Sequence, residues 1–137
     1  MAEAKAQTPP RAVARPLSPH LQIYSWTWTM AMSVIHRITG SALYVGTLLI
    51  VYWLVSLAAG PEAFETAQAV FGSVIGRFVL FGYTWALLHH MAGGIRHFVW
   101  DFGLAFERNA RMNLSRATLI VSAVLTVLVW AVALGLK

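Results

Sequence analysis

The 137-residue chain is 58% hydrophobic and only 11% charged, which is too apolar for an ordinary soluble domain. Ten basic against five acidic residues could indicate a nucleic-acid binder, but a membrane protein with basic cytoplasmic segments has the same excess. The absence of cysteine excludes disulfides, thiolate metal sites and iron–sulfur ligation by this chain. We therefore interpret the chain as an integral membrane protein that binds no nucleic acid.

Two segments precede the first long apolar run. Residues 1–14 are rich in Ala, Pro and Arg without periodicity, and they predict a mobile tail. Residues 15–29 predict an interfacial segment, because its two prolines prevent a continuous helix and its aromatic side chains are typical of the headgroup level. The aromatic residues of this segment are Tyr24, Trp26 and Trp28.

The first membrane crossing is predicted at residues 30–59, because residues 38–59 carry no charge and are long enough to cross a hydrocarbon core. A polar stripe marks the start of this helix, with its members at positions i, i+3, i+4 and i+7. The stripe consists of Ser33, His36, Arg37 and Gly40. We expect it to face protein or a ligand; the alternative is that the two basic side chains only extend to the interface.

A second helix is predicted over residues 61–100, with Pro61 in its first turn and the second crossing in its later part. Gly72 and Gly76 form a small-xxx-small pair suited to helix contact. The end of this helix carries polar side chains at membrane depth, where they are costly and therefore indicate function. These are His89, His90, Arg96 and His97.

His90 and His97 are seven residues apart, so a helix places them on nearly the same face, about 10 Å apart along its axis. Trans nitrogen ligands of one haem iron lie only about 4 Å apart, so these two histidines cannot share an iron. Gly93 and Gly94 remove side-chain bulk one turn beyond His90, which allows a flat macrocycle or another helix to approach. This combination favours His90 as a haem ligand, whereas His89 points about 100° away and is more typical of a helix contact.

The third crossing is predicted at residues 117–136, which are uncharged and contain neither His nor Met. This helix therefore looks structural, and Ser122 and Thr126 can bond to their own helix backbone, so we assign them no chemistry. Most Lys and Arg residues fall on the side of the N-terminus, which predicts that this side is cytoplasmic. The fold class predicted is an all-α membrane protein with three transmembrane helices in an up-down-up bundle.

Antiparallel packing of the first two crossings brings Ser33, His36 and Arg37 toward the depth of Arg96 and His97, with His90 about two turns deeper. Such Arg and His side chains can bind haem propionates, and Ser33 with Arg37 can hydrogen-bond a quinone. The part of the first helix expected opposite His90, residues 45–49, holds neither His nor Met. A second axial ligand is therefore expected from another polypeptide.

Two motifs resemble those of the succinate dehydrogenase cytochrome b subunit family, and together they cover about residues 15–103. The first motif consists of Arg15-Pro16-Leu17, Leu21, Trp28, Ser33, His36-Arg37 and Thr39. The second consists of His90, Gly94-Ile95-Arg96-His97, Trp100-Asp101 and Gly103.

The resemblance implies a multi-pass anchor of succinate:quinone oxidoreductase, or complex II, of the respiratory chain and tricarboxylic acid cycle. The expected membrane is the bacterial cytoplasmic membrane or the mitochondrial inner membrane. The expected partners are a flavoprotein with FAD, an iron–sulfur subunit and a smaller anchor that supplies the second ligand of a shared haem b. Ubiquinone or menaquinone would be the electron acceptor. This chain would belong to the enzyme without binding succinate.

The same resemblance implies that His90 ligates the haem iron and that Ser33 and Arg37 lie at the quinone site. His36 would lie near the haem propionates, and Arg37, Arg96 and His97 are further candidates for that region. Two alternatives stay open. One is the anchor of a quinol:fumarate reductase, since a haem and a quinone pocket do not determine the direction of electron flow. The other is a haem-free structural anchor in which the histidines only pack.

Overall fold

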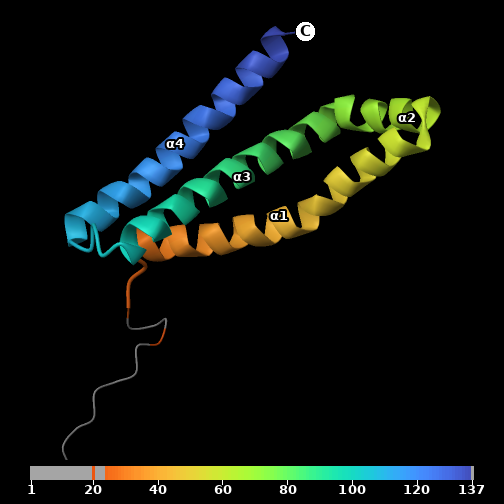
Figure 1. Ribbon diagram of the computed structural model, residues 1–137. Helices are drawn as coiled ribbons and strands as arrows, with labels where there is room; N and C mark the ends of the chain where they lie inside the picture. Colours follow the sequence, from red (N-terminus) through yellow and green to blue (C-terminus); the bar gives the residue numbers. More distant parts are fainter. Residues whose placement is uncertain (1–19, 21–23, 137) are drawn as a thin grey trace, which may run out of the picture.

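The computed structural model describes residue 20 and residues 24–136, and every regular element within them is an α-helix (Figure 1). The four helices are α1 (Trp28–Ala59), α2 (Pro61–Gly72), α3 (Val74–Asp101) and α4 (Arg108–Gly135). The predicted tail at residues 1–14 lies outside the described residues, as do residues 15–19 and 21–23 of the predicted interfacial segment. The predicted all-helical class is confirmed for the described part of the chain.

Local sequence explains both ends of α1. Thr27 has extended backbone, and its hydroxyl accepts a 3.4 Å hydrogen bond from the Met30 amide, so it caps a helix that begins at Trp28. At the other end Gly60 has a φ of 115°, a conformation that favours glycine and stops the helix. Pro61 then starts α2, because proline needs no amide partner in a first helical turn.

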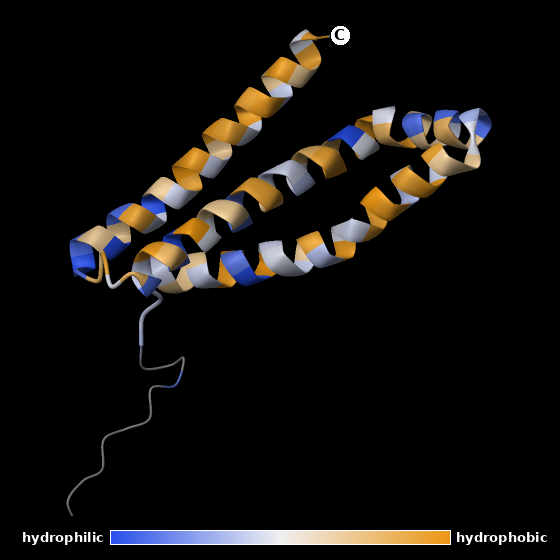
Figure 2. Ribbon diagram, in the orientation of Figure 1, coloured by the Kyte–Doolittle hydropathy of each residue, from blue (hydrophilic) through white to orange (hydrophobic). Residues whose placement is uncertain are grey.

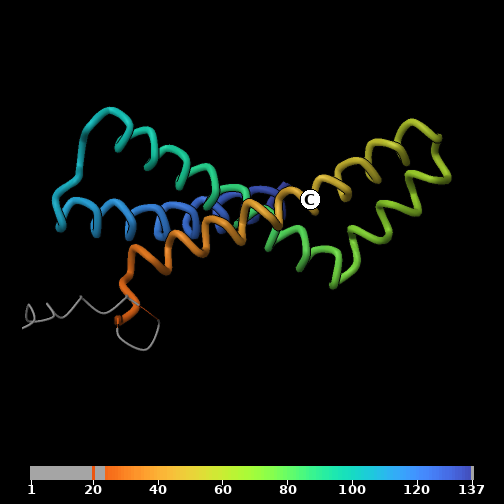
Figure 3. The backbone as a smooth tube through the Cα atoms, turned by 90° about the horizontal axis from the view of Figure 1, so that it is seen from below, coloured from red at the N-terminus to blue at the C-terminus, as the bar shows by residue number. Residues whose placement is uncertain are grey.

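The single helix predicted over residues 61–100 is two helices in the structure, α2 and α3, which bend by 77° at Ser73 (Figure 3). Ser73 is extended, and its hydroxyl caps α3 by accepting a 3.0 Å hydrogen bond from the Gly76 amide. A Cβ at Gly76 would collide with the backbone of Val70 and Phe71. Gly76 therefore permits a sharp bend, a use of the small residue that helix periodicity did not predict.

The end of the molecule where α3 turns into α4 is a three-helix cluster, in which α1, α3 and α4 all contact one another (Figures 1 and 3). Beyond it α4 diverges, while α1 and α3 continue to the α2 end (Figure 1). Small side chains allow these contacts. Gly46 faces the Tyr83 ring between α1 and α3, and the face that α4 buries carries Ser115, Thr118, Ser122 and Thr126.

The described part buries few apolar side chains, namely Met32, Ala67 and Ala86, and leaves its large hydrophobic residues outside. Length and hydropathy qualify α1 and α4 as membrane crossings, whereas α2 and α3 qualify only as a bent pair. The ribbon in Figure 2 shows that hydrophobic residues predominate along α1 and α4, while hydrophilic residues are frequent in α2 and around the α3–α4 turn. With its 28 residues, α3 is about 42 Å long, which suffices for a crossing, so the predicted up-down-up bundle stays a prediction compatible with this arrangement.

The bend can be tested with Ser73→Ala. Loss of the hydroxyl that caps α3 should lower the free energy of unfolding by about 1 kcal/mol, measured by denaturation in detergent. Ser41→Ala is the control, because the exposed Ser41 hydroxyl only bonds the Arg37 carbonyl of its own helix. Equal stability of the two variants would contradict a capping role for Ser73.

Candidate functional site

Three histidines gather where α1 packs against α3. The rings of His36 and His90 stack with centroids 4.0 Å apart and planes within 6° of parallel. The His97 ring is tilted against His36 at 5.5 Å. The structure therefore brings together the predicted histidines of the polar stripe and of the α3 motif.

Two glycines make this arrangement possible. A Cβ on Gly40 would stand 2.8 Å from Cε1 of His90, and a Cβ on Gly93 would collide with the His36 ring. Each histidine thus fills the space that a glycine leaves on the opposite helix. At Gly93 the structure shows the close approach of another helix, which is one of the two alternatives predicted. Gly94 has no neighbouring atom within 4 Å of its Cβ position.

The observed register differs from the predicted depth. We expected residues 45–49 of the first helix opposite His90, but the structure places His36, Thr39 and Gly40 there. The prediction placed Arg37 and Arg96 at the same depth. In the structure, the helices instead align so that the His90 ring lies beside Gly40 and the His36 ring lies beside Gly93. The level of His90 on α1 therefore does contain a histidine, contrary to the prediction.

His90 is oriented by hydrogen bonds from its Nδ1 side. Its Nδ1 lies 3.1 Å from the His36 carbonyl oxygen and 3.4 Å from the Thr39 hydroxyl. A carbonyl only accepts, and the Thr39 hydroxyl donates its own proton to the same carbonyl at 2.9 Å. Nδ1 therefore carries the proton, and Nε2 keeps a free lone pair suited to a metal.

An open groove of about 550 Å³ adjoins the ring of His90. Its lining residues are His36, Arg37, Gly40, Ser41, Tyr44, Val45 and His90. Arg37 is exposed, and Ser33 is exposed one helical turn before it. The groove thus combines an imidazole, a guanidinium and apolar walls, the mixture typical of a cofactor site.

Arg96 does not join this groove. Only 3% of its surface is exposed, and its guanidinium lies 5.3 Å from the centre of the Trp100 ring. Its Nε and Nη1 are buried without a hydrogen-bond partner in the described part of the chain. His97, by contrast, is exposed and contacts the histidine stack. The structure therefore separates Arg96 and His97, which sequence alone grouped together.

His89 faces the opposite neighbour, α4. It is fully buried, its Nδ1 lies 3.2 Å from the Ser122 hydroxyl, and its ring stacks on Trp85 at 5.1 Å. The prediction that His89 is a helix contact is confirmed. Sequence reasoning did not find its partner: Ser122 does bond to its own helix backbone, as predicted, but it also contacts His89.

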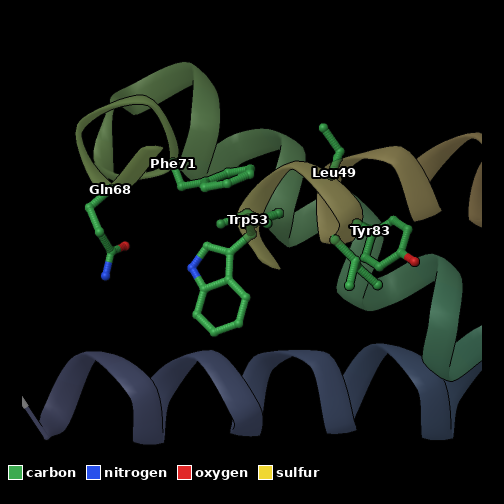
Figure 4. Close-up of a pocket in the computed structure, with 7 residues that line it drawn as sticks. Leu49, Trp53, Gln68, Phe71 and Tyr83 are labelled. Carbon is green, nitrogen blue, oxygen red and sulfur yellow. The ribbon is translucent and has the colours of Figure 1, made fainter. Parts of the chain in front are cut away.

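A second hollow, of about 290 Å³, lies at the other end of α1 and is walled by α1, α2 and α3 (Figure 4). Its labelled side chains are apolar or aromatic apart from the Gln68 amide and the Tyr83 hydroxyl. No histidine or charged residue lines it. The chemistry-bearing groups therefore concentrate at the histidine groove.

Comparison with known proteins agrees with this architecture. A family described as succinate dehydrogenase/fumarate reductase transmembrane subunit matches residues 11–129. The chain is 42% identical over 114 residues to the succinate dehydrogenase cytochrome b556 subunit of Paracoccus denitrificans, which covers 83% of this chain and 88% of the relative.

Two further relatives extend the comparison. The cytochrome b556 subunit of Rickettsia prowazekii succinate dehydrogenase is 33% identical over 116 residues, covering 85% of this chain and 90% of the relative. The human mitochondrial cytochrome b560 subunit is 40% identical over 91 residues, covering 65% of this chain and 54% of the relative.

The fold and the groove define a helical protein with candidate membrane spans and with imidazoles where α1 packs against α3. The chain belongs to the succinate dehydrogenase/fumarate reductase transmembrane subunit family. The resemblance carried by the two sequence motifs is thereby confirmed.

The fit of ring and glycine can be tested on two adjacent positions. Gly93→Ala should lower the free energy of unfolding by about 1–3 kcal/mol, because the added methyl group displaces the His36 ring. Gly94→Ala is the matched control and should raise stability by about 0.5–1 kcal/mol, since alanine favours the helix and the space is open. Thermal unfolding in detergent would measure both; a stable Gly93→Ala protein would refute the tight fit.

Proposed function

We propose that the chain is a membrane anchor subunit of succinate dehydrogenase that ligates haem b through Nε2 of His90 and forms part of a quinone site. The observation that carries the proposal is the Nδ1–H bond from His90 to the His36 carbonyl. Metal-ligating histidines usually donate their second N–H to such an acceptor, which fixes the tautomer and directs the other nitrogen toward the metal.

The residues present fit a haem better than a metal held by the protein alone. Within the described part of the chain, no group of three or more His, Cys, Asp or Glu side chains is arranged to hold a metal ion. The stacked rings of His36 and His90 run face to face, so their nitrogens do not converge on one point. A porphyrin supplies its own four nitrogens, and its iron needs only axial ligands from protein. Bound haem b would supply one-electron redox capacity.

A second protein ligand for the haem would come from the smaller anchor subunit. Two imidazoles that share one iron would each have to direct a nitrogen at it. The rings of His36 and His90 stack face to face with centroids 4.0 Å apart, so their nitrogens do not converge and His36 would not share an iron with His90. His89 points to α4 instead. A second haem ligand would therefore still have to come from another polypeptide, although the helix register differs from the prediction.

Haem propionates would be bound by His36, Arg37 and His97. His36 and Arg37 line the groove, and His97 is exposed beside the stack. Cationic and imidazole donors suit carboxylates. We leave Arg96 out of this set, because it is buried against Trp100 and does not line the groove.

Quinone would be bound by Ser33 and Arg37, which stand exposed one turn apart on α1. The serine hydroxyl can donate a hydrogen bond to a quinone carbonyl, and the guanidinium can stabilise the negative charge that develops when the quinone is reduced. Ubiquinone and menaquinone both present these carbonyl groups. Both side chains lie near the start of α1, on the predicted cytoplasmic or matrix side.

Within the assembled enzyme, succinate oxidation with FAD and electron transfer through iron–sulfur clusters would take place in the flavoprotein and iron–sulfur subunits. This chain contributes no cysteine for such clusters. Its own residues would position haem and quinone in the bacterial or mitochondrial inner membrane. A quinol:fumarate reductase would use the same site in reverse, and assays of both reactions with low- and high-potential quinones distinguish the two.

The haem assignment can be tested by His90→Leu in the assembled complex. Low-spin haem should be lost, measured by the optical spectrum and by haem content as the pyridine haemochrome. His20→Leu is the control, because His20 is exposed and lies outside the helices. Unchanged low-spin haem in His90→Leu would overturn the assignment, and a wild-type complex without haem would favour a structural anchor. Succinate–quinone activity is not the deciding measurement, since electrons can reach quinone without passing through the haem.

The quinone assignment can be tested by Arg37→Gln. Loss of a charged hydrogen bond costs about 1.5–3 kcal/mol, so succinate–quinone turnover should fall about ten- to hundredfold while subunit assembly stays near normal. Arg77→Gln is the control, since Arg77 is also exposed but lies beside the α2–α3 bend, far from the groove. An assembly defect without loss of turnover per assembled complex would contradict a direct role.

A further inference from the structure

The contact between α3 and α4 contains a directional hydrogen bond beside the proposed haem ligand. The Ser122 hydroxyl donates its proton to the Leu119 carbonyl of its own helix at 2.9 Å. Toward His89 it can therefore only accept, so the 3.2 Å contact is a bond from the His89 Nδ1–H to Ser122. Both residues are fully buried, so water does not compete with the bond.

Adjacent histidines of α3 thus bond to opposite neighbours with the same ring nitrogen. His90 donates from Nδ1 to the α1 backbone, and His89 donates from Nδ1 to α4. Consecutive residues diverge by about 100° around a helix, so the two bonds hold α3 from two sides. Trp85, one turn before His89, stacks on its ring and restricts it further.

Other buried hydroxyls of α4 do not bond to α3 in the described part of the chain. Thr118 donates to the Leu114 carbonyl and Thr126 donates to the Ser122 carbonyl, both within α4, and the Ser115 hydroxyl has no partner among the described residues. A second α3–α4 bond runs from the Trp130 indole to the Thr84 hydroxyl at 3.3 Å, further from the histidine groove. Among the small buried polar side chains of α4, Ser122 is therefore the link to α3 that lies next to His90.

We propose that His89 and Ser122 are positioning residues that set the rotation of α3 and thereby aim His90 at the haem iron. This inference rests on the proposed function. The ring tip of a helical histidine lies about 6 Å from the helix axis, so a rotation of about 2° moves it about 0.2 Å. That displacement matches the tolerance of metal–ligand distances, about 0.2 Å. A bond that holds α3 against such a rotation therefore affects the strength of the iron–histidine bond.

The experiment uses the assembled complex with His89→Leu, His89→Asn, Ser122→Ala and Thr118→Val. Haem per flavin, the electron paramagnetic resonance signal of the ferric low-spin haem and its midpoint potential are measured for each. His89→Leu and Ser122→Ala should keep the haem but shift the resonance signal. They should also change the ratio of the ferric to the ferrous affinity for the histidine ligand about tenfold, which is the lower end of the effect of losing a residue that orients a metal ligand. For a one-electron couple, a tenfold change in this ratio shifts the midpoint potential by about 59 mV.

Two variants serve as matched controls. Thr118→Val removes a buried hydroxyl that bonds only within α4 and should leave the resonance signal and the potential unchanged. His89→Asn places an amide donor near the position of Nδ1 and should restore both readouts toward the wild type. Ser122→Ala removes a single oxygen, so it keeps the test valid if His89→Leu fails to assemble.

The outcomes separate this inference from the proposed function. If His90→Leu abolishes low-spin haem but Ser122→Ala and Thr118→Val have the same resonance signal and potential, the positioning role is refuted alone. If His90→Leu keeps its low-spin haem, the proposed haem site and this inference are both refuted. Shifts in Ser122→Ala and in His89→Leu that His89→Asn reverses would establish the role.

Discussion

The contact on which the site depends is the reciprocal fit of a histidine ring against a glycine on the opposite helix. His36 occupies the space beside Gly93, and His90 occupies the space beside Gly40. Without these two glycines, α1 and α3 could not approach closely enough for the rings to stack or for His90 to reach the His36 carbonyl. Close backbone approach through small residues is a general solution to helix packing in membranes, and here it also orients an imidazole.

The helix α3 distributes its polar residues between two neighbours. Its groove side presents His90 and His97 toward α1, and another side buries His89 against α4, while the buried Arg96 packs on Trp100 of the same helix. A polar group without a hydrogen-bond partner is costly in a bilayer. The hydroxyl groups of Thr118, Ser122 and Thr126 avoid this cost by donating to backbone carbonyls of their own helix. Two side-chain hydrogen bonds link α3 to α4 in the described part of the chain: the His89–Ser122 bond, and the bond from the Trp130 indole to the Thr84 hydroxyl at 3.3 Å.

Most of the large hydrophobic side chains of the described residues lie on the outside of the molecule. Large hydrophobic side chains cover the outside of α1 and α4, while the small buried set includes Met32, Ala67 and Ala86. A bilayer and neighbouring subunits, rather than an internal core, are the expected partners of such a surface. This agrees with membership of a family of transmembrane subunits.

Sequence alone determined the membrane class and the apolar helices, and it located the polar stripe of α1 and the histidines of α3, because composition and helical periodicity are local properties. It did not determine the bend at Ser73, which arises when the Ser73 hydroxyl caps α3 and Gly76 admits the preceding backbone. Nor did it determine the register of α1 against α3. That register depends on the fit of each histidine ring beside a glycine of the other helix, and the contacting residues lie 50 or more positions apart in the sequence. The placement of Arg96 away from the groove and the pairing of His89 with Ser122 were decided only by tertiary packing, because a helical repeat specifies a direction but not the neighbour found there.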